Sequence, residues 1–234
     1  MVAGMTTDPS ALAEQLLSVG LAAGLDAGGV AGAHPFDDVR SEIERRREEG
    51  LHGGMQFTFR NPARSTDPGR ILAGARSLVV GARRTPAARL AEVGAGRMRI
   101  AAYARHDHYA DLRRSLEAVA VRLRSEGWRA IVVADDNALV DRAAAVRAGI
   151  GWWGRNANVL LPGRGSWFVL GSVVTDAPLP PSVPLDDGCG TCRQCLDGCP
   201  TGAILERGVI DARRCLAWLV QAPGPIPREF REAL

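Results

Sequence analysis

The chain contains no lysine, so all 29 of its basic residues are arginine. The 26 acidic residues nearly balance them and leave a net charge of +3. Because the missing lysine accompanies abundant alanine and glycine, we interpret it as a composition bias. The arginine content is therefore not counted as evidence for nucleic-acid binding, although it does not exclude such binding.

Long apolar runs are also missing. No segment approaches the roughly 18 consecutive apolar residues of a membrane span. The first residues do not place an apolar stretch after a basic one, as a signal peptide does. These absences predict a cytoplasmic protein without membrane association. The hydrophobic share of 46% and the charged share of 24% are typical of globular proteins, and 234 residues can form one large domain with a small appendage.

Cysteine is scarce as well, but its distribution is informative. Four of the five cysteines lie between positions 189 and 199, and the fifth, Cys215, stands apart. In a chain without an export signal, such crowding indicates metal ligands in a reducing compartment and argues against disulfides.

Apolar periodicity and turn residues predict alternating helices and strands before the cysteines. Asp8 is expected to cap a first helix with Pro9 in its first turn, ending near Gly20 or Gly24. Further helices are expected at 35–49, 109–126 and 139–148. Strands are expected at 26–33, 77–82, 97–103, 129–134, 159–161 and 167–175, the last two forming a pair through a turn at Pro162-Gly163.

This order predicts an α/β (α+β) domain followed by a small iron–sulfur domain. The expected boundaries are a disordered N-terminus at 1–8, the α/β domain at 9–176, a proline-rich linker at 177–184 and the cysteine-containing domain at 185–234.

The cysteine spacing is the most specific motif in the chain. It reads C-x2-C-x2-C-x3-C and is followed at once by Pro200, which is the spacing of bacterial ferredoxins. Two-residue steps let three thiolates turn inward around one cubane, and proline then redirects the chain so that the fourth sulfur points to another cluster. The pattern predicts [4Fe–4S] ligands at Cys189, Cys192, Cys195 and Cys199. Structural zinc, a redox CxxC pair and a disulfide knot are the alternatives.

Counting thiolates refines this prediction. Two complete cubanes need more thiolates than the five in the chain. If the first three cysteines hold one cluster, and Cys199 and Cys215 belong to a second, both clusters lack ligands. One further C-x2-C-x3-C-P motif would supply them, so we expect a C-terminally truncated chain or one that has lost its second cluster. For Cys215 the alternative is a buried free thiol.

Several other segments occur in a fixed order along the chain. They are RNPARSTDPGRILAGARSLVV at 60–80, YARHDHY at 103–109, DDNALVDRAAAVRAGIGWWGRNANVLL at 135–161, GSWFVLGSVVTD at 165–176, and DARRCLAWL with PGPIP between 211 and 227. With these segments and the cysteine run, the chain resembles epoxyqueuosine reductase, the cobalamin-dependent iron–sulfur enzyme that completes queuosine in tRNA. More distantly it resembles the reductive dehalogenases.

The resemblance implies an α/β cobalamin-binding domain before a ferredoxin-like double-cluster domain, with cobalamin and two [4Fe–4S] clusters as cofactors. It implies a tRNA anticodon loop as substrate, a ferredoxin-type or flavodoxin-type electron donor, and a monomer. It also implies a proton donor seven residues before a basic residue, which is Asp135 relative to Arg142. Desolvation near a corrin would raise the pKa of such an aspartate and suit it to general acid catalysis. The alternative for Asp135 is a helix N-cap or a solvated turn carboxylate.

The resemblance further implies cobalamin contacts in the segments named above. The candidates are Arg60, Tyr103, Asp135, Asn156, Asn158, Val159 and Leu170, of which Val159 and Leu170 would act through backbone groups. Ordinary loop or core packing is the alternative for each. Trp152 and Trp153 would cover the cofactor or fill the core.

The chain departs from the family at several positions. His108 and Ala110 stand where the family has aspartate and histidine on either side of a tyrosine, and Asn137-Ala138 replaces glycine-proline. Val220 and Ala222 replace threonine and glutamate where tRNA is expected to lie. These changes bear on the substrate more than on the cofactors. The alternatives are a diverged cobalamin-dependent reductase with another substrate and an iron–sulfur electron-transfer protein.

Overall fold

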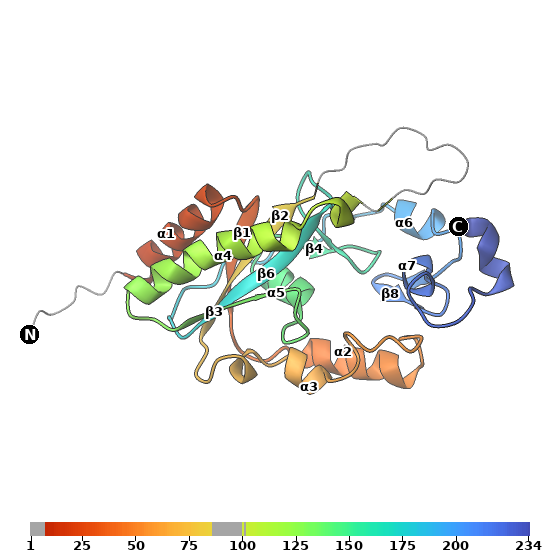
Figure 1. Ribbon diagram of the computed structural model, residues 1–234, viewed down its shortest axis with the longest axis horizontal. Coiled ribbons are helices and arrows are strands. Elements are labelled where there is room, and N and C mark those ends of the chain that lie inside the picture. The colour runs from red at the N-terminus through yellow and green to blue at the C-terminus, as the bar shows by residue number, and fades with distance from the viewer. Residues whose placement is uncertain (1–7, 86–99, 101) are drawn as a thin grey trace, which may run out of the picture.

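A four-stranded antiparallel sheet forms the centre of the computed structural model, which describes residues 8–85, 100 and 102–234 (Figure 1). The strands follow the order β1-β2-β6-β3. Their bounds are β1 Ala27–Gly32, β2 Ser77–Arg84, β6 Phe168–Thr175 and β3 Ala130–Ala134. β2 and β6 are the longest and lie in the middle, where their apolar, β-branched runs are buried on both faces.

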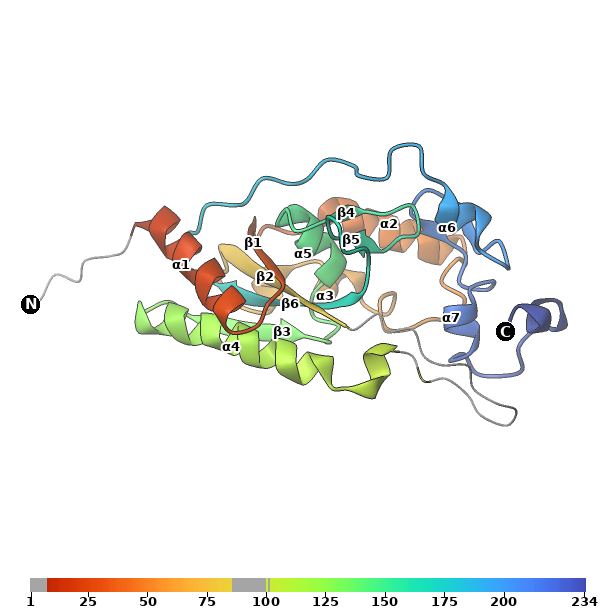
Figure 2. The same ribbon diagram turned by 90° about the horizontal axis from the view of Figure 1, so that it is seen from above.

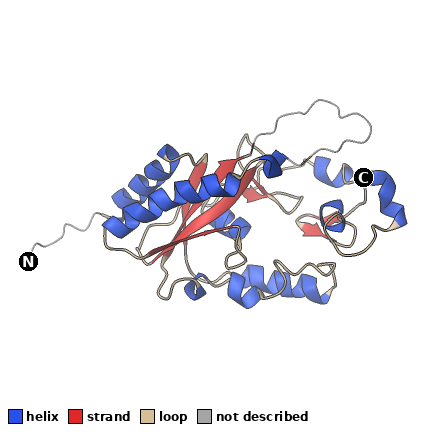
Figure 3. Cartoon of the chain, viewed as in Figure 1, coloured by secondary structure: helices blue, strands red, loops and turns tan. Residues whose placement is uncertain are grey.

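Helices cover both faces of this sheet (Figures 1 and 3). On one face, α1 (Pro9–Ala22) and α4 (His108–Ser125) pack against each other and against strand residues such as Val79 and Val173. On the other face, α5 (Asp141–Arg147) packs against Leu78, Val80 and Val174. Successive strand residues therefore enter different cores, as the period of a β-strand requires. The result is a three-layer mixed helix and sheet domain, in agreement with the predicted fold class.

The first of these cores depends on two glycines that face each other across the sheet. Gly81 of β2 pairs with Gly171 of β6, and a Cβ at either position would lie within 3.1 Å of a Leu116 methyl group. Leu116 is fully buried, so the glycines let α4 approach the sheet closely.

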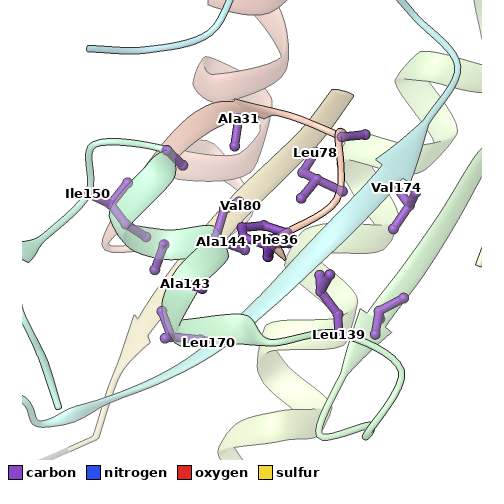
Figure 4. Packing of buried hydrophobic residues seen from close by; sticks show 14 of the residues in the cluster. Ala31, Phe36, Leu78, Val80, Leu139, Ala143, Ala144, Ile150, Leu170 and Val174 are labelled. Atoms are coloured by element: carbon purple, nitrogen blue, oxygen red, sulfur yellow. The ribbon is translucent and has the colours of Figure 1, made fainter. Parts of the chain in front are cut away.

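The second core is closed by Phe36, which precedes α2 (Asp37–Glu48). Figure 4 shows the Phe36 ring among Val80, Ala144 and Leu78, and the ring is 1% exposed. The Arg147 guanidinium lies 3.4 Å from the ring centroid and donates a hydrogen bond to the His34 carbonyl. This contact fastens the segment before α2 to the end of α5.

Short elements complete the described part of the chain. They are α3 Pro62–Ser65, η1 Pro68–Arg70, η2 Ala102–Arg105, β4 Trp152–Trp153, β5 Val159–Leu160, α6 Gln194–Asp197, β7 Ile204–Glu206, β8 Val209–Ile210, α7 Leu216–Leu219 and η3 Arg228–Ala233. The last five of these elements, from α6 onward, belong to the cysteine-containing part. Figure 1 shows this part at the end of the molecule away from the N-terminus.

Most predicted elements are confirmed within a few residues, including the Asp8 cap, whose carboxylate accepts hydrogen bonds from Ser10 and Ala11. Two strand predictions are wrong. The last two residues of the strand predicted at 97–103 belong instead to the 3₁₀ helix η2. Of its other residues, 97–99 and 101 lie outside the described part of the chain. The predicted pairing of 159–161 with 167–175 is replaced by β4 pairing with β5, while β6 pairs with β2 and β3. Only a single bridge, Leu161 to Gly165, remains at the predicted turn.

The predicted linker at 177–184 is extended and lies against the first domain (Figure 2). Ser182 exchanges two hydrogen bonds with Val30, so the linker covers the free edge of β1. Gly149 has a φ of +69°, and a Cβ there would lie 2.2 Å from the Val183 carbonyl oxygen. A close backbone approach therefore holds the linker in place. No helix in the described residues is long and apolar enough to span a membrane.

Candidate functional site

Asp135 occupies a strained turn directly after β3. Its φ is +54°, and among the described residues only one other non-glycine residue, Ala157, has a positive φ. The neighbouring Asp136 holds the turn, because its Oδ1 accepts a hydrogen bond from the Ala138 backbone. The Asp135 carboxylate is exposed and has no hydrogen-bond partner among the described residues. It is therefore not a helix N-cap, but as an exposed carboxylate in a turn it matches the other predicted alternative.

Three further ionisable side chains surround this turn. Asp141 and Arg142 begin α5, and Tyr109 lies in the first turn of α4. Burial raises the pKa of Asp141 well above its usual range, and the negative charges of Asp135 and Asp136 raise it further. Its Oδ1 is buried without a partner among the described residues. Asp141 is thus a carboxyl group that the fold keeps protonated to higher pH than usual.

Tyr109 and Arg142 show the same desolvation. Burial raises the pKa of Tyr109, and the charges of Asp135 and Asp141 raise it as well. Burial lowers the pKa of Arg142, although the residue is exposed to solvent. Tyr109, Asp141 and Arg142 thus form a group of partly desolvated ionisable side chains beside the Asp135 turn.

Asp141→Asn is expected to stabilise the protein at alkaline pH. The folded-state pKa of Asp141 is raised, so the wild-type protein loses stability as pH rises from the usual aspartate pKa through the folded value. The amide removes this loss, and the melting temperature at about pH 8 should rise by roughly 3 °C, with little gain at about pH 4. Thermal denaturation at the two pH values measures the difference. Asp136→Asn is the matched control, and an equal effect of both substitutions would contradict the assignment.

Arg142 connects this acidic turn to the loop at 154–158. Its guanidinium donates a hydrogen bond of 3.2 Å to the carbonyl of Ala157, the second strained residue. Within the loop the Asn156 side chain accepts from the Asn158 backbone, and the Gly154 backbone donates to the Asn158 carbonyl. These bonds fix the two asparagines side by side between strands β4 and β5.

The two asparagines and two cysteines line one cavity. Asn156 and Asn158 form one side of it, and Cys199 and Cys215 belong to the other, in a volume of about 260 Å³. Apolar side chains of the iron–sulfur part, including Ile204 and Leu216, close the remainder. The structure thus brings Cys199 and Cys215 together, as the thiolate count predicts, and sets them against the predicted cobalamin-contact loop.

Cys199 is prepared as an anionic ligand. Burial acts to raise the pKa of its thiol, but hydrogen bonds from the Ile204 and Ala203 backbones and from Thr201 outweigh burial and lower the pKa. The Ala203 N–H lies 3.2 Å from the Cys199 sulfur. N–H donors to a thiolate are the contacts by which proteins stabilise cluster sulfur ligands, so the donor set fits an iron–sulfur centre.

The first three cysteines lie outside this cavity, with Cys189 in a turn, Cys192 directly after it and Cys195 in α6. Cys192 donates its backbone N–H to the Cys189 carbonyl, and Gly190 between them has a φ of +49°. Arg155 of the asparagine loop donates a hydrogen bond of 2.7 Å to the Gly190 carbonyl. All five cysteines are free thiols, so the disulfide alternative finds no support in the described residues.

The other predicted contacts are more scattered. Tyr103 is exposed on η2, and it is near enough to Tyr109 for its charge to contribute to the raised pKa of Tyr109. Arg60 is exposed and precedes α3. The Ser65 carbonyl of α3 accepts a hydrogen bond from the backbone N–H of Val140, which follows the acidic turn. Val159 and Leu170 are buried in the core, so they can offer a ligand only backbone groups.

The two tryptophans behave differently from each other. The Trp152 ring lies against Gly188 in the cysteine-containing part, where a Cβ would be 2.5 Å from the ring. Trp153 is 37% exposed. Trp152 therefore packs the two parts of the chain together.

Asp141 and Tyr109 were not among the predicted site residues. Arg142 served only to mark the spacing of Asp135, and its own role was also missed. Asp141 lies one position before Arg142 in an apolar helix, and an acidic residue at the start of a buried segment was the available signal.

Comparisons with known proteins identify the family and the iron–sulfur domain. The model of a 4Fe-4S double cluster binding domain matches residues 188–234. An epoxyqueuosine reductase from Bacillus anthracis is 31% identical over 230 residues, which cover 95% of this chain and 60% of that protein. The crystal structure of an epoxyqueuosine reductase with an epoxyqueuosine-modified tRNA-Tyr stem loop has a TM-score of 0.81 and 29% identity, covering 93% of this chain and 59% of that one.

A catabolic reductive dehalogenase shares the fold, with a TM-score of 0.64 and 22% identity over 93% of this chain and 30% of that one. The predicted resemblance and the [4Fe–4S] domain are therefore confirmed. The chain spans about 60% of the length of the epoxyqueuosine reductases from Bacillus anthracis and Bacillus cereus.

Proposed function

The chain is a homologue of the epoxyqueuosine reductase family over nearly its whole length, and from this premise we propose that it reduces epoxyqueuosine to queuosine in tRNA. The reaction removes the epoxide oxygen as water and consumes two electrons and two protons. It therefore needs an electron supply, a reactive metal centre and a proton donor.

One observation carries this proposal. Asp135 is near enough to Asp141 for its charge to raise the Asp141 pKa, and the next residue, Arg142, donates a hydrogen bond to Ala157 in the asparagine loop. That loop shares a cavity with Cys199 and Cys215. A proton donor, a loop of amide groups and cluster ligands thus adjoin one another. An electron-transfer module would need only the last of these three.

Asp135 is proposed as the proton donor to the epoxide oxygen. The turn holds its carboxylate free of hydrogen bonds to the described residues, and the neighbouring Asp141 and Tyr109 are desolvated by the surrounding protein. A bound ligand that closed the site would exclude water from around Asp135, as transfer of a proton to the substrate requires. The exposed αL turn lets the carboxyl group reach a substrate without rebuilding the sheet.

The cofactors are proposed to be cobalamin and [4Fe–4S] clusters. Cobalamin supplies the reactive metal centre when bound. Asn156 and Asn158 would hold its corrin amides, with Arg60 and Tyr103 at the periphery and backbone groups of Val159 and Leu170. Cys189, Cys192 and Cys195 would ligate one cluster, and Cys199 and Cys215 another.

The remaining proposals concern organisation and partners. Residues 9–176 would form the cobalamin-binding domain and 185–234 the iron–sulfur domain, joined by the linker at 177–184. A tRNA anticodon loop would be the substrate, as a tRNA stem loop is in the structure of a relative. Such a substrate makes the cytoplasm the expected location, and a ferredoxin or flavodoxin the expected electron donor to a monomer.

Cobalamin binding tests the proposal directly. The protein is prepared anaerobically with reconstituted clusters, mixed with cobalamin and separated from unbound cofactor, and absorption and EPR spectra are recorded. We expect corrin bands to remain with the protein alongside cluster absorbance. Clusters without retained corrin would overturn the proposal and favour the electron-transfer alternative. Retained corrin without turnover of epoxyqueuosine-containing tRNA would favour a diverged reductase with another substrate.

A further inference from the structure

A second group of metal-binding side chains lies at the start of α4. It includes His108, one of the positions at which the chain departs from the family pattern. One possible ligand atom from each of His106, His108 and Asp111 lies within 4.8 Å of the other two. The His106 Nε2 is 2.8 Å from Asp111 Oδ2, and the two imidazole rings meet edge to face with centroids 5.0 Å apart. None of these residues belongs to the acidic turn or to the cysteine site.

We propose that His106, His108 and Asp111 bind one divalent transition-metal ion of the Zn²⁺ class. Two imidazole nitrogens and one carboxylate oxygen are a donor set that such ions prefer. Three protein ligands leave a coordination position open to water.

The state of His108 distinguishes this group from an ordinary ion-pair network. His108 is only 6% exposed, and its Nε2 is buried with no hydrogen-bond partner among the described residues. A buried polar atom without a partner is costly, and proteins rarely retain one without a reason. A metal ion between His106 and Asp111 would satisfy this nitrogen.

Two arginines affect the strength of the site. Arg114 bonds Asp111 Oδ1, and Arg83 lies 3.2 Å from Oδ2. Each carboxylate oxygen carries two lone pairs, so one can face an arginine while the other faces a metal ion. Their positive charges lower the affinity but orient the carboxylate, as outer partners of metal ligands do. The Arg114 side chain is 72% exposed and can move away at little cost.

The ion would fasten two elements that adjoin the proposed active site. His106 follows η2, which carries Tyr103, whereas His108 and Asp111 belong to α4, whose next residue after His108 is Tyr109. Binding would therefore fix η2 against the first turn of α4. The site is a structural clamp beside the reaction centre, and it is separate from the cofactors.

Titration with Co²⁺ alone tests the site in cluster-loaded protein. We expect one Co²⁺ per chain with weak visible d–d bands, displaced by Zn²⁺, and without the intense near-ultraviolet bands of thiolate ligation. His106→Ala should abolish these d–d bands, and since His106 is exposed the fold should survive, which circular dichroism checks. His34→Ala, at another exposed histidine, is the matched control and should bind like the wild type.

Arg114→Ala supplies an independent test that does not depend on removing a ligand. Loss of one neighbouring positive charge should tighten Co²⁺ binding by roughly fivefold. Three results would overturn the proposal. They are no d–d bands in the wild type, bands of unchanged intensity in His106→Ala, and weaker binding in Arg114→Ala.

Discussion

Asp135→Asn is expected to lower the rate of epoxyqueuosine reduction by about 10²- to 10⁴-fold, the usual contribution of a positioned general acid. The amide occupies the same volume as the carboxyl group but cannot deliver a proton to the epoxide oxygen. Single-turnover assays with an epoxyqueuosine-containing tRNA stem loop measure this loss. Cluster content should stay unchanged, because no cluster ligand is altered.

The backbone makes asparagine the informative replacement. Asp135 has a φ of +54°, and asparagine is one of the few residues that adopts this conformation readily. Alanine would change both the chemistry and the strain of the turn, whereas asparagine changes the chemistry alone. A loss of activity in Asp135→Asn with an unchanged melting temperature therefore indicates that the lost function is proton delivery by Asp135.

Asp136→Asn is the control for this experiment. The Asp136 side chain uses its Oδ1 to accept from the Ala138 backbone, and an asparagine Oδ1 can accept the same bond. Activity should remain within a few-fold of the wild type. Full activity of Asp135→Asn, or an equal loss in both variants, would remove Asp135 from the proposed role.

The sequence predicted local elements better than their pairing. Helix α4 and strand β2 follow from periodicity, turn residues and apolar runs, all of which are local properties. The pairing partners of β6 do not follow from local properties. Strands β2 and β3 are distant from β6 in the chain, and the nearer segment 159–161 competes with them for pairing with β6. A proline-glycine turn favoured the nearer partner, but the longer register with β2 buries far more apolar surface.

The site shows the same limit. Spacing alone predicted the cysteines, because cluster ligation constrains neighbouring residues, whereas Asp135 required a family resemblance. Neither spacing nor resemblance predicted Asp141, since its raised pKa depends on burial in the fold and on the charges of Asp135 and Asp136. The group of His106, His108 and Asp111 was also missed, because their spacing matches no metal motif and their convergence depends on the junction between η2 and α4.

The proposed division of the cysteines between two clusters predicts the second large effect. Cys192→Ser is expected to remove the iron and sulfide of one cluster, because serine is a poor ligand for a cubane that depends on Cys189, Cys192 and Cys195. Cys199→Ser and Cys215→Ser are expected to affect a different cluster, since these two sulfurs share one cavity. Iron and acid-labile sulfide analysis, with EPR of the reduced protein, distinguishes the two losses.

Combining the substitutions makes the assignment stringent. If two residues serve one cluster, either substitution alone already removes that cluster. The double variant with Cys199→Ser and Cys215→Ser should therefore lose no more iron than either single variant. Cys192→Ser with Cys199→Ser should instead lose the iron of both clusters. The opposite pattern, in which Cys192→Ser and Cys199→Ser abolish the same EPR signal and do not add, would mean that the four crowded cysteines hold a single cubane. The N–H donors that Ala203 and Ile204 direct at Cys199 would then stabilise that cubane, and the cavity beside Asn156 and Asn158 would need another occupant.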